Sequence, residues 1–392
     1  MATPLPSGSP AVAFSDCVSG RLEDGVLVVV IDNPPVNAAS TAVRKGLLAA
    51  IHHASDEDSV RGVVVTGAGR AFVGGADIRE FDTPVVEPAL PEVLALMEGS
   101  EKPVVAAING VALGGGCEIA LACHVRLASA EAKLGLPEVK LGIIPGAGGT
   151  QRLPRLTGMA AAVEMIATGR IVNAAEAHRL GIVDTVVQGD LLDTARKEAG
   201  RLAGAPPRRS GELRVPAFDA AVVDSAAAKA LARSRGQAAP AEAIRLVRSA
   251  AELPFAEALI EERATFLRLR GSDQAKALRH VFFAERAAAK VRGIEGAEPR
   301  SVRTVAVIGA GLMGSGIAVC ALDAGYQVIC VEQTAERAAA GRDRIAALYD
   351  RAIASGRLDE AGKASRMARL RVADRLDAVA DADLVIEAVF DD

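Results

Sequence analysis

The sequence lacks the features that mark a secreted, membrane-spanning or nucleic-acid-binding protein. Its five cysteines include no Cys-x-x-Cys pair, which argues against a disulfide framework or a zinc site and favours a reducing compartment. Residues 1–10 do not resemble a signal peptide, and no apolar run approaches the ~20 residues of a membrane span. The 45 lysines and arginines are scattered and the formal net charge is −4, so nucleic acid is not an expected partner. We expect a cytoplasmic protein with no metal centre and no integral membrane segment.

The chain contains enough apolar material for more than one core. Its 392 residues, 50% of them hydrophobic, are expected to form two or three domains. Two regions alternate short apolar strands with helical segments, which predicts an α/β fold. In the first region strands are predicted at 26–32, 62–66, 103–108 and 125–127, and helices at 42–54, 117–123 and 174–180. Asn173 is placed to cap the last of these helices. In the second region strands are predicted at 304–308, 328–331 and 384–389, and helices at 312–324 and 335–355.

The stretch between these regions has a different composition. Residues 201–240 are rich in Ala, Arg, Pro, Ser and Gly without steady periodicity, which predicts a loosely packed connection with helical patches. Apolar residues then recur at helical spacing over 241–291, which predicts several helices. We therefore expect a domain at 12–200, a linker with helices at 201–300, and a second domain at 301–392.

Two glutamates beside glycine-rich backbone indicate chemistry in the first region. The triplet 114–116 follows an apolar strand and opens an apolar helix, with Glu118 in its first turn, and Glu138 lies in a second glycine-rich stretch. Helix N-terminal amides stabilise developing negative charge and carboxyls move protons, so the pairing suits a thioester carbonyl that becomes an enolate. Residues 67–77 are a second candidate donor loop. Each glycine-rich segment also fits an ordinary tight turn, and a first-turn glutamate also complements the helix dipole.

Four motifs in a fixed order carry a resemblance to a known family. They are Asn-Pro-Pro-Val-Asn-Ala at 33–38, Phe-Val-Gly-Gly-Ala-Asp-Ile at 72–78, and the stretches 109–118 and 136–145. Residues 24–190 thereby resemble the crotonase superfamily of enoyl-CoA hydratases and isomerases. The resemblance implies a crotonase-like ββα spiral, a coenzyme A thioester as substrate, and hydration of trans-2-enoyl-CoA to 3-hydroxyacyl-CoA. It leaves Δ3-Δ2-enoyl-CoA isomerisation by the same groups open.

Carried over position by position, the resemblance assigns roles to four residues. The backbone N–H groups of Ala76 and Gly115 hold the thioester oxygen, Glu118 activates water, and Glu138 donates a proton to the α-carbon. The pair is implied more directly than this division of roles, because interacting carboxyls titrate together.

Other residues have weaker assignments. Phe283 and Arg286 lie three positions apart on one predicted helix face and match a place where crotonases contact coenzyme A, although core packing with a solvated arginine fits as well. We expect His124 to be a packed or surface residue and Asp77 to fix its loop by hydrogen bonds.

A second site is predicted near the C-terminal end of the sequence. Gly309, Gly311 and Gly314 follow a predicted strand and open a helix, and Glu332 ends the next strand. This context predicts a dinucleotide fold, in which the glycines let the pyrophosphate approach the backbone. Glu332 is expected to accept a hydrogen bond from the ribose 2′-OH, which favours NAD over NADP. An apolar strand, turn and helix with incidental glycines is the alternative.

Residues 301–392 resemble the N-terminal half of the NAD-binding Rossmann domain of 3-hydroxyacyl-CoA dehydrogenases, through the motifs at 307–318 and 383–391. Met313 and Asp391 match positions that contact NAD in that family. The stretch 277–286 resembles the helical linker of multifunctional fatty-acid β-oxidation enzymes. The whole sequence therefore resembles the bifunctional enoyl-CoA hydratase/3-hydroxyacyl-CoA dehydrogenase family.

The resemblance stops short of the dehydrogenase chemistry. Family members carry the catalytic histidine and its glutamate partner beyond the portion matched here, so we expect oxidation of 3-hydroxyacyl-CoA only in a full-length form, and weak NAD binding at most. The alternative function is a non-catalytic module that holds acyl-CoA or NAD, or assembles with a thiolase subunit. A peroxisomal address stays open, because such a signal lies at a C-terminus.

Overall fold

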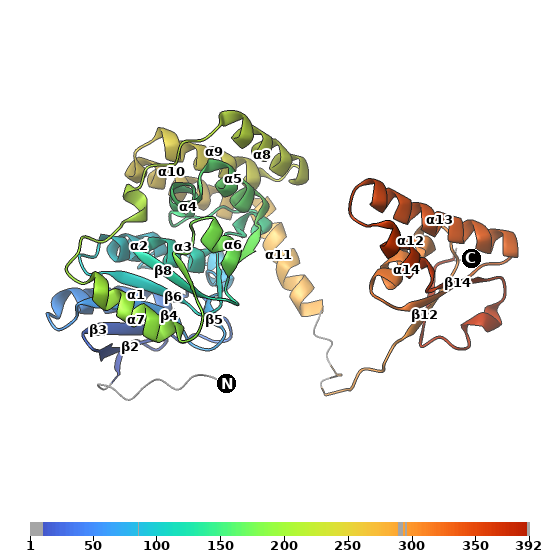
Figure 1. Cartoon of the computed structure of the whole chain (residues 1–392), viewed down its shortest axis with the longest axis horizontal. Helices are drawn as coiled ribbons and strands as arrows, with labels where there is room; N and C mark the ends of the chain where they lie inside the picture. The colour runs from blue at the N-terminus through green and yellow to red at the C-terminus, as the bar shows by residue number, and fades with distance from the viewer. Residues whose placement is uncertain (1–10, 85, 289–292, 295, 390–392) are drawn as a thin grey trace. The chain divides into compact units, whose positions relative to one another are not determined.

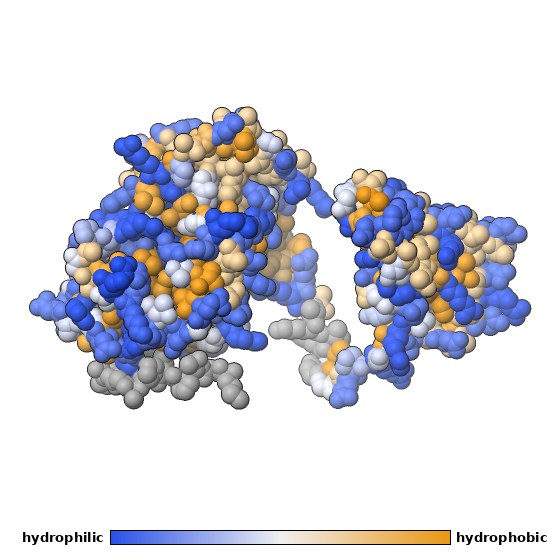
Figure 2. Space-filling view, viewed as in Figure 1, coloured by the Kyte–Doolittle hydropathy of each residue, from blue (hydrophilic) through white to orange (hydrophobic). Residues whose placement is uncertain are grey.

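The computed structural model describes residues 11–84, 86–288, 293–294 and 296–389 (Figure 1). Two compact units, Met1–Lys290 and Val291–Asp392, divide the chain. In Figure 2 hydrophilic residues cover much of the visible face of each unit and apolar residues form smaller patches. No helix in the described ranges is long and apolar enough to cross a membrane.

The first unit contains two sheets. The larger has the strand order β1-β2-β3-β4-β6-β8-β11, and its strands are β1 (Val12–Ser15), β2 (Val18–Glu23), β3 (Val26–Ile31), β4 (Gly62–Gly67), β6 (Val104–Ile108), β8 (Val125–Ser129) and β11 (Thr185–Val187). From β3 to β11 neighbouring strands are parallel. The pairings of β1 with β2 and of β2 with β3 are antiparallel. The smaller sheet has the order β10-β9-β7-β5, with β5 (Ala71–Val73), β7 (Val111–Leu113), β9 (Lys133–Gly135) and β10 (Ile171–Asn173).

Both faces of the larger sheet are covered, which explains why strands such as β3 and β6 are continuous apolar runs rather than alternating ones. On one face Val64 and Val105 pack against α7 (Leu191–Leu202). On the other face Val63 and Val65 belong to the main core, together with residues of α1 (Thr41–Asp56), α2 (Leu90–Gly99) and α3 (Gly115–Ala122). The segments of the site follow strands of the smaller sheet instead: Ala76 follows β5, Gly115 follows β7 and Glu138 follows β9.

Helices from the predicted linker belong to the first compact unit. Here α8 (Ala220–Arg233) and α9 (Ala238–Glu252) pack on α5 (Met159–Thr168), and α9 and α10 (Phe255–Arg270) pack on α4 (Gly149–Thr157) (Figure 1). The remaining elements of the unit are α6 (Ala174–Arg179), α11 (Asp273–Ala288), η1 (Ile78–Asp82), η2 (Glu138–Leu141) and η3 (Ser210–Glu212). The predicted domain boundaries at 200 and 300 stay predictions.

The second unit is a four-stranded parallel sheet with the order β14-β13-β12-β15. Its elements are β12 (Thr304–Ile308), α12 (Leu312–Asp323), β13 (Gln327–Val331), α13 (Ala335–Ala354), α14 (Glu360–Met367), β14 (Leu370–Ala373), η4 (Leu376–Val379) and β15 (Leu384–Glu387). By chain position the order reads 3-2-1-4, the Rossmann arrangement with its switch point between the first and fourth strands.

The predicted α/β fold is confirmed in both units. The four strands predicted in the first region are β3, β4, β6 and β8, which are consecutive in the larger sheet. The predicted cap of α6 is present, because the Asn173 side chain accepts from the Glu176 amide at 2.9 Å. The sequence pattern did not predict β14, α14 or the strands of the smaller sheet, whose three residues each are too few to show a period.

Candidate active site

Two glycine-rich segments bring a pair of backbone amides together. Gly115 begins α3, and a Cβ atom added to it would lie 3.6 Å from the Ala76 nitrogen. Ala76 is held by a β-bridge to Ala39, whose amide donates to the Gly75 carbonyl at 2.8 Å. The Ala76 amide nitrogen therefore lies beside the N-terminus of α3, where backbone amides are free of intrahelical partners.

Close approach explains the glycine triplet that opens α3. Gly114 has a φ of 50°, and an added Cβ would lie 3.0 Å from Glu138 Oε1. An added Cβ on Gly116 would lie 2.0 Å from the Val73 carbonyl oxygen, so β5 and α3 could not pack at their present separation. The triplet thus lets a strand, a helix and a carboxyl group meet.

Glu118, in the first turn of α3, is buried and oriented by backbone. Its Oε1 accepts from the amides of Ala147 (2.7 Å) and Gly149 (2.9 Å). Burial raises the pKa of this carboxyl, while the two amides and the nearby cations of Arg152 and Arg263 act in the opposite direction. These groups favour the ionised form.

Glu138, at the start of η2, has a different environment. Its Oε2 atom is buried and has no hydrogen-bond partner among the described residues. Burial first, and then the charge of Glu118, raise the pKa of Glu138 well above its ordinary value. An unpartnered buried carboxyl oxygen favours the protonated form and leaves a place for water or substrate.

A third carboxyl group, Glu262 of α10, lies beside this pair and was missed in the sequence analysis. It is 1% exposed and accepts from the amides of Gly148 (2.5 Å) and Thr150 (2.9 Å). Burial and the charge of Glu118 raise the pKa of Glu262 to about 8. The sequence signal was a glutamate that follows apolar positions on a helix, which is also typical of a solvated face.

One pocket is lined by all four residues to which the sequence analysis gave hydratase roles: Ala76, Gly115, Glu118 and Glu138. Its empty volume is about 830 Å³, open mouth included. Much of the remaining lining is apolar, from Ala39, Phe81, Pro84, Val86, Leu90, Ile143, Ile144 and Phe266, and Arg263 adds a cation that lies 5.2 Å from the Phe266 ring. A mainly apolar pocket with a few converging polar groups is typical of a small-molecule site.

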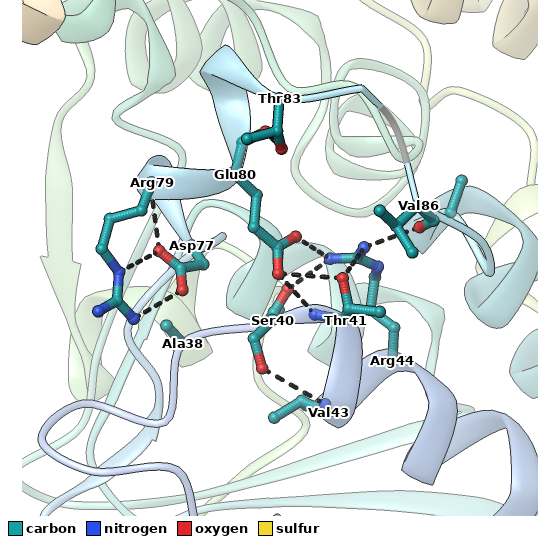
Figure 3. A network of polar contacts seen from close by, with 12 residues as sticks. Ala38, Ser40, Thr41, Val43, Arg44, Asp77, Arg79, Glu80, Thr83 and Val86 are labelled. Carbon is teal, nitrogen blue, oxygen red and sulfur yellow. Dashed lines mark hydrogen bonds and ion pairs between the residues drawn. The ribbon is translucent and has the colours of Figure 1, made fainter.

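The pocket wall between η1 and α2 is held by a buried arginine (Figure 3). Arg44 of α1 donates to Glu80 Oε2 at 2.8 Å and to the Ala39 carbonyl at 3.0 Å. Its other donors reach the Pro88 and Val86 carbonyls and the Thr41 hydroxyl. Arg44 therefore uses all five of its N–H groups, and four of them join Glu80 and residues 86–88 of the wall to Ala39, which pairs with Ala76.

The structure does not bring the other predicted substrate residues to this pocket. Phe283 and Arg286 lie on α11, are exposed, and are not among the pocket-lining residues. Arg286 lies over the ring of Phe282 at 3.9 Å instead. Their contact with coenzyme A stays a prediction.

His124 is packed in the interior, and Asp77 makes hydrogen bonds within its own loop. His124 is 1% exposed, accepts from the Val104 amide through Nδ1, and pairs through Nε2 with the Glu98 carbonyl. Asp77 caps η1 and pairs with Arg79. Within the described ranges no group of three or more His, Cys, Asp and Glu residues is arranged to hold a metal ion.

In the second unit the glycine turn after β12 has the form that a dinucleotide needs. Gly309 has a φ of 91°, and an added Cβ on Gly314 would lie 1.7 Å from the Gly309 carbonyl oxygen, so both positions require glycine. An added Cβ on Gly311 would meet no atom within 4 Å. Glu332, directly after β13, accepts from the Ala310 amide at 2.7 Å and thus lies at this turn.

These residues fit the adenosine and pyrophosphate part of NAD, because open backbone at Gly311, a helix N-terminus and a carboxylate meet at one place. Met313 is 75% exposed in the first turn of α12, next to this turn. Asp391 lies outside the described residues.

Fold and site together define a crotonase-fold protein with a second, dinucleotide-type unit. Residues 21–241 match the family model described as enoyl-CoA hydratase/isomerase, and residues 304–392 match that of the 3-hydroxyacyl-CoA dehydrogenase NAD binding domain. The chain belongs to the enoyl-CoA hydratase/isomerase family, and its two matched domains follow the order of bifunctional hydratase/dehydrogenases.

Individual relatives agree with this assignment. A peroxisomal bifunctional enzyme of Danio rerio is 42% identical over 376 residues, which are 94% of this chain and 52% of that protein. A peroxisomal fatty acid beta-oxidation multifunctional protein of Arabidopsis thaliana is 39% identical over 391 residues, 94% and 53% of the two chains. The structure of a carnitinyl-CoA dehydratase from Mycobacterium avium has 30% identity and a TM-score of 0.50, and covers 68% of this chain and 96% of that one. The chain thus spans about half the length of the curated relatives it matches.

Proposed function

We propose that this chain hydrates trans-2-enoyl-CoA to 3-hydroxyacyl-CoA, a step of fatty-acid β-oxidation. The observation that carries the proposal is the single pocket lined by two adjacent amide donors, Ala76 and Gly115, and two buried carboxyls, Glu118 and Glu138. Hydration of a conjugated thioester needs both kinds of group. Negative charge develops on the carbonyl oxygen, while one proton leaves the water that attacks the β-carbon and another is added to the α-carbon.

The environments of the two glutamates support a division of roles. Glu118, which accepts two backbone hydrogen bonds, acts as the base that takes a proton from water as the water oxygen bonds to the β-carbon. The Ala76 and Gly115 amides stabilise the enolate oxygen that forms. Glu138, with its pKa raised well above the ordinary value, gives its proton to the α-carbon. A proton then passes from Glu118 to Glu138 and restores both groups.

Isomerisation of Δ3-enoyl-CoA to Δ2-enoyl-CoA passes through a dienolate whose oxygen the same two amides would hold, and it is proposed as a secondary activity. It requires only removal of a proton from the α-carbon and return of one to the γ-carbon, both within reach of a pair of carboxyls.

A direct assay tests the hydration proposal. Addition of purified chain to crotonyl-CoA should cause loss of the ultraviolet absorbance of the conjugated thioester, with formation of 3-hydroxybutyryl-CoA in equal amount. Binding of crotonyl-CoA without turnover would instead favour the non-catalytic module.

For the second unit we propose NAD binding through the glycine turn and Glu332, and for a complete protein the oxidation of 3-hydroxyacyl-CoA with NAD as hydride acceptor. For the 392 residues we propose no such oxidation. Steady NADH formation from 3-hydroxybutyryl-CoA by the purified chain would contradict this, because it would require a proton acceptor for the hydroxyl within the residues present.

Partner and compartment are further proposals. Acyl-CoA is the partner that the pocket supports, and association with a thiolase subunit remains the alternative, testable by co-purification. The relatives named above are peroxisomal by name, whereas the composition of this chain led us to propose the cytoplasm. Fluorescence microscopy of the tagged protein in its own cells distinguishes the two.

A further inference from the structure

A four-residue segment, 147–150, lies between two buried carboxyl groups, and its consecutive amides alternate between them. The first and third amides, those of Ala147 and Gly149, donate to Glu118. The second and fourth donate to Glu262, at 2.5 and 2.9 Å. The segment is therefore held from both sides.

This arrangement replaces an ordinary helix cap. The segment leads into α4, whose N-cap residue, Gly148, has no side chain to accept from the first free amides. Carboxyl groups from α3 and α10 accept from them instead, and the Thr150 hydroxyl adds a further hydrogen bond to Glu262. Gly148 has a φ of 101°, a left-handed conformation that lets neighbouring amides face different partners.

The Ala147 peptide is also fixed through its carbonyl. Arg152 donates to the Ala147 carbonyl at 2.9 Å and is paired with Glu98 at 2.8 Å. Both side chains are almost fully buried. Glu262 accepts from the Gly148 and Thr150 amides, which alternate with the two amides that donate to Glu118. Its hydrogen bonds therefore constrain the orientation of the Ala147 and Gly149 amides.

We propose that Glu262 is a positioning residue for hydration: it holds the second and fourth amides of segment 147–150 and thereby keeps the Ala147 and Gly149 amides aimed at Glu118. The inference rests on the proposed function. Glu262 acts through backbone, not by touching substrate.

The charged groups around the segment determine how pH enters. Glu118 faces Glu138 of η2, Arg152 of α4 and Arg263 of α10, and Glu262 lies beside Glu118. A negative charge on Glu262 raises the pKa of Glu118, because the two carboxyls repel each other. Loss of that charge alone would move the acid limb to lower pH, whereas weaker amide hydrogen bonds to Glu118 would move it to higher pH, so the direction of the shift separates the two causes.

The test compares Glu262→Gln with Glu261→Gln. Glutamine keeps the size of the side chain but has one acceptor oxygen, so it cannot accept from both amides. Glu261 is the adjacent residue of the same helix, is half-exposed and pairs with Arg245, so its change removes a carboxyl without touching the segment. Rates of crotonyl-CoA hydration, their pH profiles, melting temperatures and amide hydrogen exchange at 147–150 are measured for both.

We expect Glu262→Gln to lower kcat by about tenfold or more with KM within about twofold, since misaimed groups cost rate rather than ground-state binding. The acid limb of kcat should move to higher pH, because weaker amide hydrogen bonds stabilise the Glu118 carboxylate less. Amides 147–150 should exchange faster, and Glu261→Gln should match the wild type in all respects. A lower melting temperature with kcat, acid limb and exchange unchanged would overturn the proposal.

Two further results keep the test decisive. If Glu262→Gln does not fold, Thr150→Val removes only the hydroxyl bond to Glu262 and should cause a smaller change of kcat and acid limb in the same direction; no change would overturn the proposal. If the wild-type chain itself does not hydrate crotonyl-CoA, the proposed function fails. The hydrogen-exchange comparison then decides whether Glu262 holds the segment.

Discussion

Three glutamates of one chemical type are given different properties by the atoms around them. Glu118 receives two amides, Glu138 has a buried oxygen with no partner among the described residues, and Glu262 receives two amides and a hydroxyl. Burial raises the pKa of each, and the partners then decide how far the carboxylate is favoured. Environment, rather than residue type, thus distinguishes the three carboxyls, and it supports the proposed roles of base, acid and positioning group.

Replacing Glu118 or Glu138 by glutamine should lower the rate of crotonyl-CoA hydration by roughly 10²-fold or more, because each variant loses a proton-transfer group while keeping its size. Circular dichroism and melting curves should show an intact fold. Glu131→Gln, at an exposed position between β8 and β9, is the matched control and should retain wild-type activity. A Glu118 or Glu138 variant that keeps near-full turnover would rule out the two-carboxyl mechanism.

The raised pKa of Glu138 also predicts a pH-dependent effect on stability. Below the ordinary pKa of 4.5 the group is neutral in both the folded and the unfolded chain, so it has no pH-dependent effect. As pH rises above 4.5, the unfolded chain ionises first and folding is penalised until the folded group also ionises. Glu138→Gln lacks this penalty, so its melting temperature relative to wild type should rise as the pH increases from 4.5 toward neutrality. A difference that is constant or falls over this interval would contradict the raised pKa.

At the scale of elements, the site is assembled by segments that are distant in sequence. The Ala76 loop follows β5, Gly115 opens α3, Glu138 begins η2, and α10 supplies Arg263 to the pocket wall. The matched hydratase/isomerase model ends at residue 241. The helix that completes the pocket thus lies outside the match, which makes α10 part of the site by packing rather than by motif.

Replacing Arg44 tests how strongly the pocket wall depends on this one side chain. Arg44→Met keeps the apolar stem but leaves the Ala39, Val86 and Pro88 carbonyls without their donor. We expect the free energy of unfolding to fall by about 2 kcal/mol or more and KM for crotonyl-CoA to rise several-fold, because the wall and the Ala76 segment are no longer joined.

Arg79→Met is the control for this change, since it also removes an arginine from a carboxylate pair on the same segment, but at an exposed position. It should leave stability and KM nearly unchanged. Equal effects of the two variants, measured by urea unfolding and steady-state kinetics, would show that the buried network has no special role.

The sequence predicted the elements with a strong local signal. The apolar strands β3, β4, β6 and β8 and the N-cap Asn173 were predictable because each depends on neighbouring residues. The smaller sheet was not, since its strands of three residues form only by pairing with distant partners. Glu262 was missed for the same reason, because its burial depends on a segment more than 100 positions away in the chain.

The order of the motifs predicted four residues that line one pocket, whereas the two residues predicted on a helix do not line it. Ala76, Gly115, Glu118 and Glu138 belong to short motifs with little freedom of placement, and their roles stay predictions. Phe283 and Arg286 were predicted from helical spacing and one matched family position, and neither determines the face that a helix presents to a pocket.

At the scale of the whole molecule, two units have separate cores. Val63, Leu121 and Leu246 belong to a core of the first unit, whereas Val307 and Ile345 belong to a core of the second. A ligand of one unit should therefore stabilise that unit by mass action and leave unfolding of the other unchanged.

Gly311 gives the sharpest test of this separation. An alanine there meets no atom within 4 Å, so the fold should tolerate it, yet its methyl group would occupy the backbone space that the pyrophosphate of NAD needs. NAD should raise only the melting transition of the second unit in the wild type, and Gly311→Ala should abolish that shift while crotonyl-CoA hydration stays at the wild-type rate. Gly316→Ala, within α12 and equally free of neighbours, should keep the NAD shift and gain up to about 1 kcal/mol of helix stability. An NAD shift that survives in Gly311→Ala would place the dinucleotide elsewhere, and a loss of hydration in the same variant would show that the two units do not act separately.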